Sequence, residues 1–344
     1  MVNRTDDADC PACCSPSWTD VEEWQGFRIV SCSACGLEYT LNPDYRPDRY
    51  KDGYRGAGDL PVPEEHVHVY RAPAERLRLE TRALVLPPPY LTPAECLALR
   101  WLVENAPSGA TIIDCGCGTG RFLRALLRKG FRAVGVDISA EIVSLLNGAG
   151  LVAKEGKAPD FPWNDPPPFA ISFFEVLEHI PAPVDVLGAL RERFPETVIV
   201  ASVPSPYRAC LLFGGERGLS DYPPNHFLRW TPQALQKAFG RAGYRRVEVH
   251  LPKPRGSEIL PGLGSLVFRW RRSRSRPTRH VEREGEVLRN AGGRKGVMAR
   301  LEATGALWLL WVYQRGADLV GRPRAWWFSC RGASSASMLV IAQP

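Results

Sequence analysis

Hydrophobic and polar positions change their period along the chain. Between residues 110 and 250, short apolar runs alternate with amphipathic helical patterns. The runs cover 110–114, 131–136, 150–153, 169–174, 197–203 and 244–250, and helical patterns separate most of them, at about 120–129, 139–148, 184–194 and 231–242. This alternation predicts a parallel sheet with helices on both faces. Ligands of such sheets bind beyond the carboxyl ends of the strands.

Other patterns flank this region. Two helices are expected at roughly 74–86 and 93–106, and the second begins with Thr92 as N-cap, Pro93 in the first turn and an acidic residue after it. Residues 252–333 interrupt the alternation and contain a helical stretch at about 297–318. An apolar run at 337–342 predicts a last strand.

A glycine turn follows the first strand of the alternating region. Gly116, Gly118 and Gly120 occupy every second position. The third glycine comes one residue too early for the dinucleotide fingerprint, and Arg121 stands where that fingerprint has glycine. The glycines let a ligand approach the backbone at a helix N-terminus, where unpaired N–H groups lie.

Two carboxylates at strand ends narrow the choice of ligand. Asp114 would repel a pyrophosphate but suits a ligand with a positive group, such as an amino-acid ammonium. Asp137, 23 residues later, is suitably placed to hold a ribose diol, and Ile138 beside it can cover an adenine face. A ligand with an ammonium, a carboxylate, a ribose and an adenine is S-adenosylmethionine.

These residues carry a resemblance to a known family. The segment D-C-G-C-G-T-G, from Asp114 to Gly120, resembles the D-x-G-x-G-x-G motif of class I methyltransferases. The resemblance implies a Rossmann-like seven-stranded α/β sheet whose last strand is antiparallel. It also implies that the turn, Cys117 included, holds the methionine end of the cofactor.

A second segment, F-F-E-V-L-E-H-I-P-A-P at 173–183, resembles the E-V-L-E-H motif of the small-molecule and quinone-modifying branch of that family. The resemblance places Glu175 against the cofactor and His179 near the donor methyl. Glu178 is expected to be an ordinary acid that interacts with a helix N-terminus. For His179, a catalytic role and a structural role stay equally open.

A third segment, 221–249, resembles the substrate-side block of the same branch. Its Thr231-Pro232 pair also predicts a helix start on its own. His226 is the other candidate base, against the alternative of an ordinary loop histidine.

The N-terminal cysteines predict a metal site. Cys10 and Cys13 form one C-x-x-C pair, Cys32 and Cys35 form another, and 18 residues separate them. Two such pairs can give four thiolates to one tetrahedral zinc. Cys14 follows the first pair, where glycine is usual. A ribbon this short has almost no core, so the metal would stabilise its fold.

Charge is distributed unevenly. The net charge is +7, yet residues 253–331 alone contain 17 Lys or Arg against six Asp or Glu, so the rest of the chain is acidic. Five of the ten tryptophans lie in this basic segment: Trp270, Trp308, Trp311, Trp326 and Trp327. Three interpretations are open: an insertion docked on the sheet, a peripheral membrane-surface contact through 268–327, or a nucleic-acid contact.

The sequence therefore predicts an S-adenosylmethionine-dependent methyltransferase that acts by in-line transfer on a small-molecule acceptor, such as a hydroxyl-bearing sugar, a phenol or a lipid-linked intermediate. A nucleic-acid methyltransferase or a nucleic-acid-binding zinc-ribbon protein is the alternative, and a non-catalytic scaffold is disfavoured by the intact turn and its two acids. No apolar run is long enough for a membrane span and no signal peptide is evident, so a location in the cytoplasm, either free or at the membrane periphery, is expected. The expected organisation is a zinc ribbon (1–40), a linker with N-terminal helices (41–106), the cofactor-binding core (107–251), a basic Trp-rich helical insertion (252–333) and the last strand (334–344).

Overall fold

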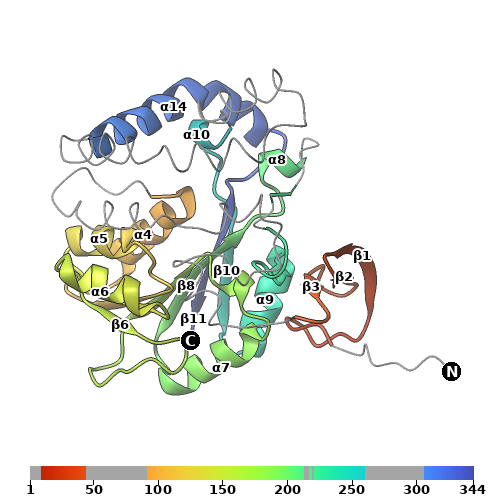
Figure 1. Cartoon of the computed structure of the whole chain (residues 1–344), viewed down its shortest axis with the longest axis horizontal. Helices are drawn as coiled ribbons and strands as arrows, with labels where there is room; N and C mark the ends of the chain where they lie inside the picture. The colour runs from red at the N-terminus through yellow and green to blue at the C-terminus, as the bar shows by residue number, and fades with distance from the viewer. Residues whose placement is uncertain (1–8, 44–90, 213–216, 219–220, 260–305) are drawn as a thin grey trace, which may run out of the picture.

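The computed structural model describes residues 9–43, 91–212, 217–218, 221–259 and 306–344 (Figure 1). The helix expected at 74–86 lies outside these residues. So do the first part of the helix expected at 297–318 and Trp270 in the basic segment.

Seven strands form one mixed sheet in the order β10-β11-β8-β7-β4-β5-β6. Five of them run parallel to one another: β4 (Thr111–Cys115), β5 (Arg132–Asp137), β6 (Ala153–Glu155), β7 (Ala170–Phe174) and β8 (Val198–Pro204). The last strand, β11 (Ser337–Gln343), is inserted between β8 and β10 (Arg246–His250) and is antiparallel to both. The expected seven-stranded sheet with an antiparallel last strand is confirmed.

Helices cover both faces of this sheet (Figure 1). Successive strand residues point to opposite faces, so Ile112 packs with the helices of one face and Ile113 with those of the other. The first face is covered by α4 (Pro93–Asn105), α5 (Arg121–Arg128) and α6 (Ala140–Gly148). The second is covered by α7 (Pro183–Arg193) and α9 (Pro232–Arg241). The short helix α8 (Ala209–Leu212) follows β8. We call this body the sheet domain.

The start of α4 follows its sequence signal and also supports the glycine turn. Thr92 and Glu95 form a reciprocal capping box, as the Thr92-Pro93 start predicts. Glu95 is 2% exposed, and its second oxygen accepts from Arg121 at 2.7 Å. Arg121, which replaces a fingerprint glycine, therefore ties the start of α5 to the start of α4.

The N-terminal module, residues 9–43, is a small sheet that we call the ribbon. It contains β1 (Trp18–Trp24), β2 (Phe27–Cys32) and β3 (Glu38–Thr40) in antiparallel order. A fourth strand, β9 (Leu228–Arg229), comes from the substrate-side block and pairs with β3. Buried ribbon residues such as Leu37 also join the apolar core under α7 and α9. The ribbon thus shares both its sheet and its core with the sheet domain.

Near the C-terminus, α14 (Ala306–Ser329) packs on the short helix α10 (Gly256–Ile259). Gly256 and Gly321 let the two backbones approach closely, and the Ser257 amide donates to Asp318 at 3.1 Å. The helix continues past 318, where the sequence pattern ended it, and passes through Pro323. Among the described residues, no helix is both long and apolar enough to cross a membrane.

Candidate functional site

The glycine turn lies at the carboxyl end of β4 and leads into α5. Gly116, Gly118 and Gly120 all have positive φ, at 70°, 47° and 69°. A Cβ on Gly116 would lie 2.6 Å from Val176 Cγ2, and one on Gly120 would lie 2.7 Å from Leu146 Cδ2. Space above Gly118 is open, with nothing within 4 Å of an added Cβ. Gly120 is the N-cap of α5 and provides no side-chain cap. The amides of Gly116, Gly118 and Gly120 already donate to Val136, Asp137 and Cys117, so a ligand placed over Gly118 meets an open backbone surface beside the N-terminus of α5.

Asp137, at the end of β5, is only 6% exposed. Its two oxygens accept from the backbone amides of Gly118 and Ser139, each at 3.0 Å. Burial raises the pKa of this carboxyl, against these hydrogen bonds. Ile138 follows it and is partly exposed. A carboxylate accepts more than two hydrogen bonds, so Asp137 can also receive ligand hydroxyls.

Asp114 lies beneath the turn and is 3% exposed. Ser172 on the neighbouring strand β7 donates to it at 2.6 Å. Burial raises the pKa of Asp114 to about 7, and the nearby acids Glu95 and Asp137 add to this effect. An electrostatically negative floor of this kind favours a positively charged ligand. Because Asp114 is so deeply buried, an intervening water suits contact with a ligand better than direct contact does.

The two cysteines of the turn point away from the ligand side. Cys117 is 7% exposed, and its Sγ lies where a Cβ on Gly135 of β5 would go. Burial raises the pKa of both Cys115 and Cys117, so neither is a reactive thiolate at neutral pH. Cys117 was expected to help hold the cofactor, but its side chain packs against β5, and its amide and carbonyl already bond to Val136 and Gly120.

Glu175 follows β7 in a strained conformation with φ of 58°. Its Oε1 accepts from Ser202 Oγ of β8 at 2.8 Å, and burial raises the pKa of its carboxyl. A non-glycine residue at positive φ is held there by its surroundings and is frequent at functional sites. The next residue, Val176, packs on Gly116 and joins this segment to the glycine turn.

Glu178 and His179 lie in the 3₁₀ turn η3 (Leu177–His179), and His226 lies across from them. The two imidazole rings meet edge to face with centroids 4.7 Å apart. His226 is flanked by two carboxylates, with Nε2 at 3.8 Å from Glu178 and Nδ1 at 3.7 Å from Asp221. The structure therefore brings the two predicted histidines together.

Glu178 was expected to be an ordinary acid at a helix N-terminus, and it does lie in the first turn of η3. It is fully buried, and neither of its oxygens has a hydrogen-bond partner among the described residues. Burial raises its pKa well above the usual range, and Glu175 raises it further. Asp221 behaves differently: burial acts to raise its pKa, but His226 and Arg208 outweigh burial and hold it below the ordinary value.

The two histidines differ as proton acceptors. His179 Nδ1 lies 2.6 Å from the carbonyl oxygen of Asn225, so Nδ1 carries the proton. Burial, with His226 nearby, lowers the pKa of His179 to about 3. At that value His179 is neutral at pH 7 and only a weak base. His226 differs in its surroundings, because its Nδ1 faces Asp221 and its Nε2 faces Glu178.

The ribbon brings the four predicted cysteines together. The Sγ atoms of Cys10, Cys13, Cys32 and Cys35 all lie within 4.8 Å of one another. The closest pairs are Cys10–Cys35 at 3.6 Å and Cys13–Cys32 at 3.5 Å. Tetrahedral thiolates around zinc, with Zn–S bonds of about 2.3 Å, lie about 3.8 Å apart, so the four thiols fit that metal.

Both cysteine knuckles have the same backbone turn. The amides of Cys14 and Gly36 donate to the carbonyl oxygens of Cys10 and Cys32, at 2.8 and 2.9 Å. Cys14 has φ of 57° and Gly36 has 71°, which explains why glycine is usual at this position. Cys14 is exposed and lies outside the group of four thiols.

A comparison with known protein families agrees with the fold of the seven-stranded sheet. Residues 92–249, just under half of the chain, match the family model of a methyltransferase domain. Over these residues the chain is similar to methyltransferase domains. The methyltransferase motifs therefore lie in the segment that the family model covers, and the cysteine pairs lie outside it.

Curated relatives align with only part of this chain, and the aligned region is only part of each relative. A ubiquinone biosynthesis O-methyltransferase of Xylella fastidiosa is 33% identical over 99 residues, 26% of this chain and 40% of the relative. One of Paracidovorax citrulli is 31% identical over 105 residues, 27% of this chain and 43% of the relative. The chain thus spans about 40% of the length of these relatives. A solved S-adenosylmethionine-dependent methyltransferase of Archaeoglobus fulgidus aligns with 73% of this chain and 94% of its own, at 15% identity and a TM-score of 0.39.

The sequence patterns did not predict that several charged residues would lie beside His226. Glu178, Asp221 and the arginines near them are ordinary charged residues in the sequence. Glu178 belongs to the E-V-L-E-H segment, and Asp221 begins the substrate-side block. Both positions were therefore available as signals, but only the fold shows that they flank His226.

Proposed function

We propose that this chain is an S-adenosylmethionine-dependent methyltransferase that modifies a hydroxyl group of a small-molecule acceptor. The observation that carries the proposal is the open space over Gly118, between the buried acids Asp114 and Asp137. When bound, the cofactor supplies a methyl group that is already activated. The work left to the protein is to bind, to orient the acceptor and to accept a proton.

Each predicted cofactor residue has a role in this proposal. Asp137 holds the ribose hydroxyls and Ile138 covers the adenine. Backbone groups of the glycine turn hold the methionine end, and Asp114 faces the ammonium through water. Glu175 lies beside the bound cofactor, because Val176 packs its segment on the turn.

His226 is the proposed base for a hydroxyl acceptor. The low pKa of His179 makes it a poor base, whereas Glu178 and Asp221 flank His226. His226 Nε2 is the atom that accepts the acceptor's proton, and Asp221, which faces Nδ1 and has a lowered pKa, stabilises the resulting imidazolium. His179 then positions His226 through their ring contact.

The acceptor class rests on the relatives. The two ubiquinone-biosynthesis relatives are named as O-methyltransferases, which supports a hydroxyl acceptor. A nucleic-acid acceptor stays the alternative because of the basic C-terminal segment. The discriminating experiment supplies the protein with methyl-labelled S-adenosylmethionine, a low-mass cell extract and total RNA. Label in the low-mass fraction, lost in His226→Asn, supports the proposal, and label in RNA overturns it.

Zinc is the proposed metal of the ribbon, held by Cys10, Cys13, Cys32 and Cys35. The Cys35 thiol beside Cys10 lowers the pKa of Cys10 to about 5, so a thiolate forms readily there. This metal has a structural role, because four thiolates fill a tetrahedral zinc site and leave no position for a substrate.

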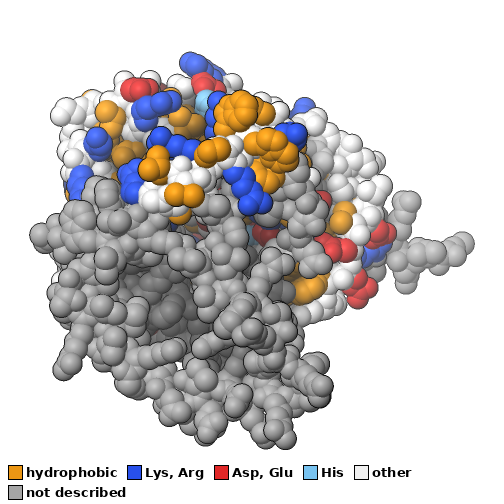
Figure 2. All heavy atoms as spheres, turned by 90° about the horizontal axis from the view of Figure 1, so that it is seen from above, with side chains coloured by type: hydrophobic (Ala, Val, Ile, Leu, Met, Phe, Trp, Pro, Cys, Tyr) orange, Lys and Arg blue, Asp and Glu red, His pale blue; other side chains and the backbone are white. Residues whose placement is uncertain are grey.

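We also propose that α14 contacts an anionic membrane surface. Four apolar side chains on its outward face are strongly exposed: Leu319 at 62%, Val320 at 73%, Trp326 at 68% and Trp327 at 43%. Figure 2, which looks down on this side, shows apolar and basic side chains gathered together. At 100° per residue these four positions share one face, and Arg322 and Arg324 flank it on either side. An apolar stripe between arginines is typical of helices that lie in a lipid headgroup layer.

A further inference from the structure

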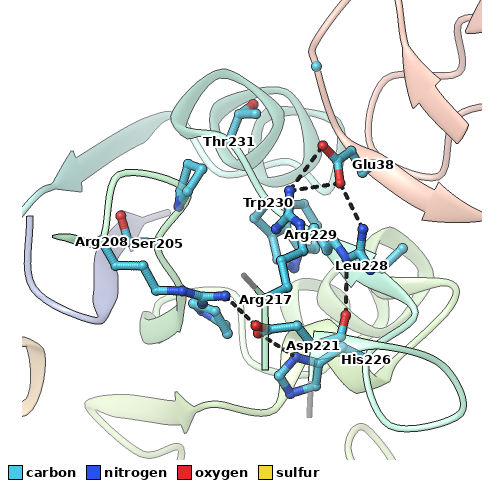
Figure 3. Close-up of a pocket in the computed structure, with 13 residues that line it drawn as sticks. Glu38, Ser205, Arg208, Arg217, Asp221, His226, Leu228, Arg229, Trp230 and Thr231 are labelled. Carbon is cyan, nitrogen blue, oxygen red and sulfur yellow. Dashed lines mark hydrogen bonds and ion pairs between the residues drawn. The ribbon is translucent and has the colours of Figure 1, made fainter. Parts of the chain in front are cut away.

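An open pocket lies between the ribbon and the sheet domain (Figure 3). Glu38 of β3 contributes one wall. Arg208 and Arg217 come from the segment after β8, and His226, Arg229 and Trp230 come from the substrate-side block. We call this the ribbon pocket. Because His226 lines it, an acceptor bound there lies next to the proposed base.

Three arginines line the ribbon pocket, and their side chains are mostly buried, with 13%, 26% and 9% exposed for Arg208, Arg217 and Arg229. The acids around them are already paired. Asp221 pairs with Arg208, and Glu38 pairs with both Arg217 and Arg229 at 3.1 Å (Figure 3). The three arginines and the acids Asp221, Glu38 and Glu22 therefore balance one another, and these ion pairs by themselves favour neither a cationic nor an anionic ligand.

Two N–H donors in the same wall have no partner among the described residues. They are Nη2 of Arg229 and Nε1 of Trp230, and both atoms are buried. The other nitrogens of the Arg229 guanidinium are engaged: Nη1 donates to Glu22 at 2.7 Å, and Nε donates to the carbonyl oxygen of Asp221 at 3.0 Å. A buried donor without a partner is unfavourable, so this wall favours a ligand that brings acceptor oxygens.

We propose that the ribbon pocket binds a carboxylate or phosphate group of the methyl acceptor, through Arg229, Trp230 and Arg217. This inference rests on the proposed function and adds the acceptor's chemical class: a small molecule with both a hydroxyl and an anionic group. An arginine fork matches the oxygen geometry of either anion. The ribbon then takes part in acceptor recognition, because Glu38 orients two of these arginines.

The test is calorimetric titration of the zinc-loaded full chain with 4-hydroxybenzoate, phenyl phosphate and the uncharged 4-hydroxybenzamide. Binding of one anion at least tenfold tighter than the amide is expected, and the two anions separate a carboxylate site from a phosphate site. Trp230→Phe keeps the ring and removes the N–H, so it weakens anion binding about tenfold. Arg217→Gln weakens it as well. Arg246→Gln, which changes an exposed arginine of β10 outside the pocket, leaves it unchanged.

Equal affinity for the amide and both anions, or unchanged anion binding in both pocket variants, overturns the inference. Titration of the same samples with S-adenosylhomocysteine separates this failure from failure of the proposed function. If the protein binds S-adenosylhomocysteine but not the anions, only the proposed anion site in the ribbon pocket is rejected. Anion binding without binding of S-adenosylhomocysteine rejects the methyltransferase proposal and leaves the anion site standing.

Discussion

The hydroxyl of Thr231 donates to the carbonyl oxygen of Cys35 at 2.7 Å. Thr231 is also the N-cap of α9, where it accepts from the Ala234 amide at 3.0 Å. One side chain therefore starts a helix of the sheet domain and fixes the second cysteine knuckle of the ribbon. The ribbon is thus tied to the substrate side of the domain, and the glycine turn lies elsewhere, at the end of β4.

Removing zinc should loosen the ribbon and the strand β9 paired with it, and should leave the glycine turn unchanged. A strong chelator, or Cys13→Ser, is expected to release the ribbon strands and with them β9, because the metal holds the cysteine knuckles. Hydrogen exchange followed by mass spectrometry should show faster exchange over 9–43 and 226–231, with 111–139 unchanged. Cys14→Ser is the matched control and should retain zinc. Equal loss of protection over 111–139 would contradict this division.

Changing glycines of the turn should separate folding from binding. Gly118→Ala places a methyl group in open space at a positive φ, so it should cost only about 1 kcal/mol of folding free energy. It should nevertheless weaken cofactor binding more than tenfold, because the methyl group occupies the ligand's space. Gly188→Ala, in α7 with open space around it, is the control and should keep full affinity. Denaturant unfolding and calorimetry measure the two effects, and an unaltered affinity in Gly118→Ala would place the ligand elsewhere.

Binding of S-adenosylmethionine should depend on pH through Asp114. Its pKa is raised to about 7 in the free protein, and a cationic ligand favours the ionised form. Affinity is therefore expected to rise as pH increases from 6 to 8, by about tenfold, and to level off above that. Asp114→Asn should bind more weakly with a flatter profile, whereas Asp185→Asn, an exposed acid of α7, should retain the wild-type profile. A flat wild-type profile would mean that Asp114 does not face the ligand charge.

Replacing the two histidines should rank them as bases. His226→Asn is expected to lower kcat by about 10²–10⁴-fold, the usual contribution of a general base, while cofactor affinity stays unchanged. His179→Asn should have a smaller effect, because its pKa of about 3 makes it a weak base. A larger loss in His179→Asn would reverse the assignment.

Binding to membranes should follow the exposed face of α14. Flotation with vesicles of phosphatidylglycerol and phosphatidylcholine should carry the protein upward, and pure phosphatidylcholine vesicles should carry much less. Trp326→Ala should reduce flotation, whereas Val152→Ala, an exposed apolar residue far along the chain, should not. Equal flotation of the two variants would show that α14 does not form the contact.

Much of the sheet domain could be predicted because its strands are buried apolar runs with clear ends. The strand predicted at 110–114 is Thr111–Cys115, and the one predicted at 169–174 is Ala170–Phe174. The two-residue strand β9 could not be foreseen. Leu228 and Arg229 carry no periodic pattern, and their pairing with β3 depends on where two distant segments meet.

In the site, too, local motifs could be predicted from the sequence, whereas features that depend on distant segments could not. The glycine turn and the cysteine pairs are local motifs, so spacing alone predicts them. The raised pKa of Glu178 depends on burial by residues far away in the sequence, and its position indicated only an ordinary acid at a helix N-terminus. The roles assigned to the site residues themselves stay predictions until ligands are measured.

The most direct test of the central claim is calorimetric titration of the zinc-analysed protein with S-adenosylmethionine and S-adenosylhomocysteine, beside Asp137→Ala. The proposal predicts saturable micromolar binding of both ligands to the wild type. It also predicts loss of that binding in the variant, which should remain folded by circular dichroism. Absence of binding to a folded, zinc-loaded wild type, or equal binding by Asp137→Ala, would contradict it.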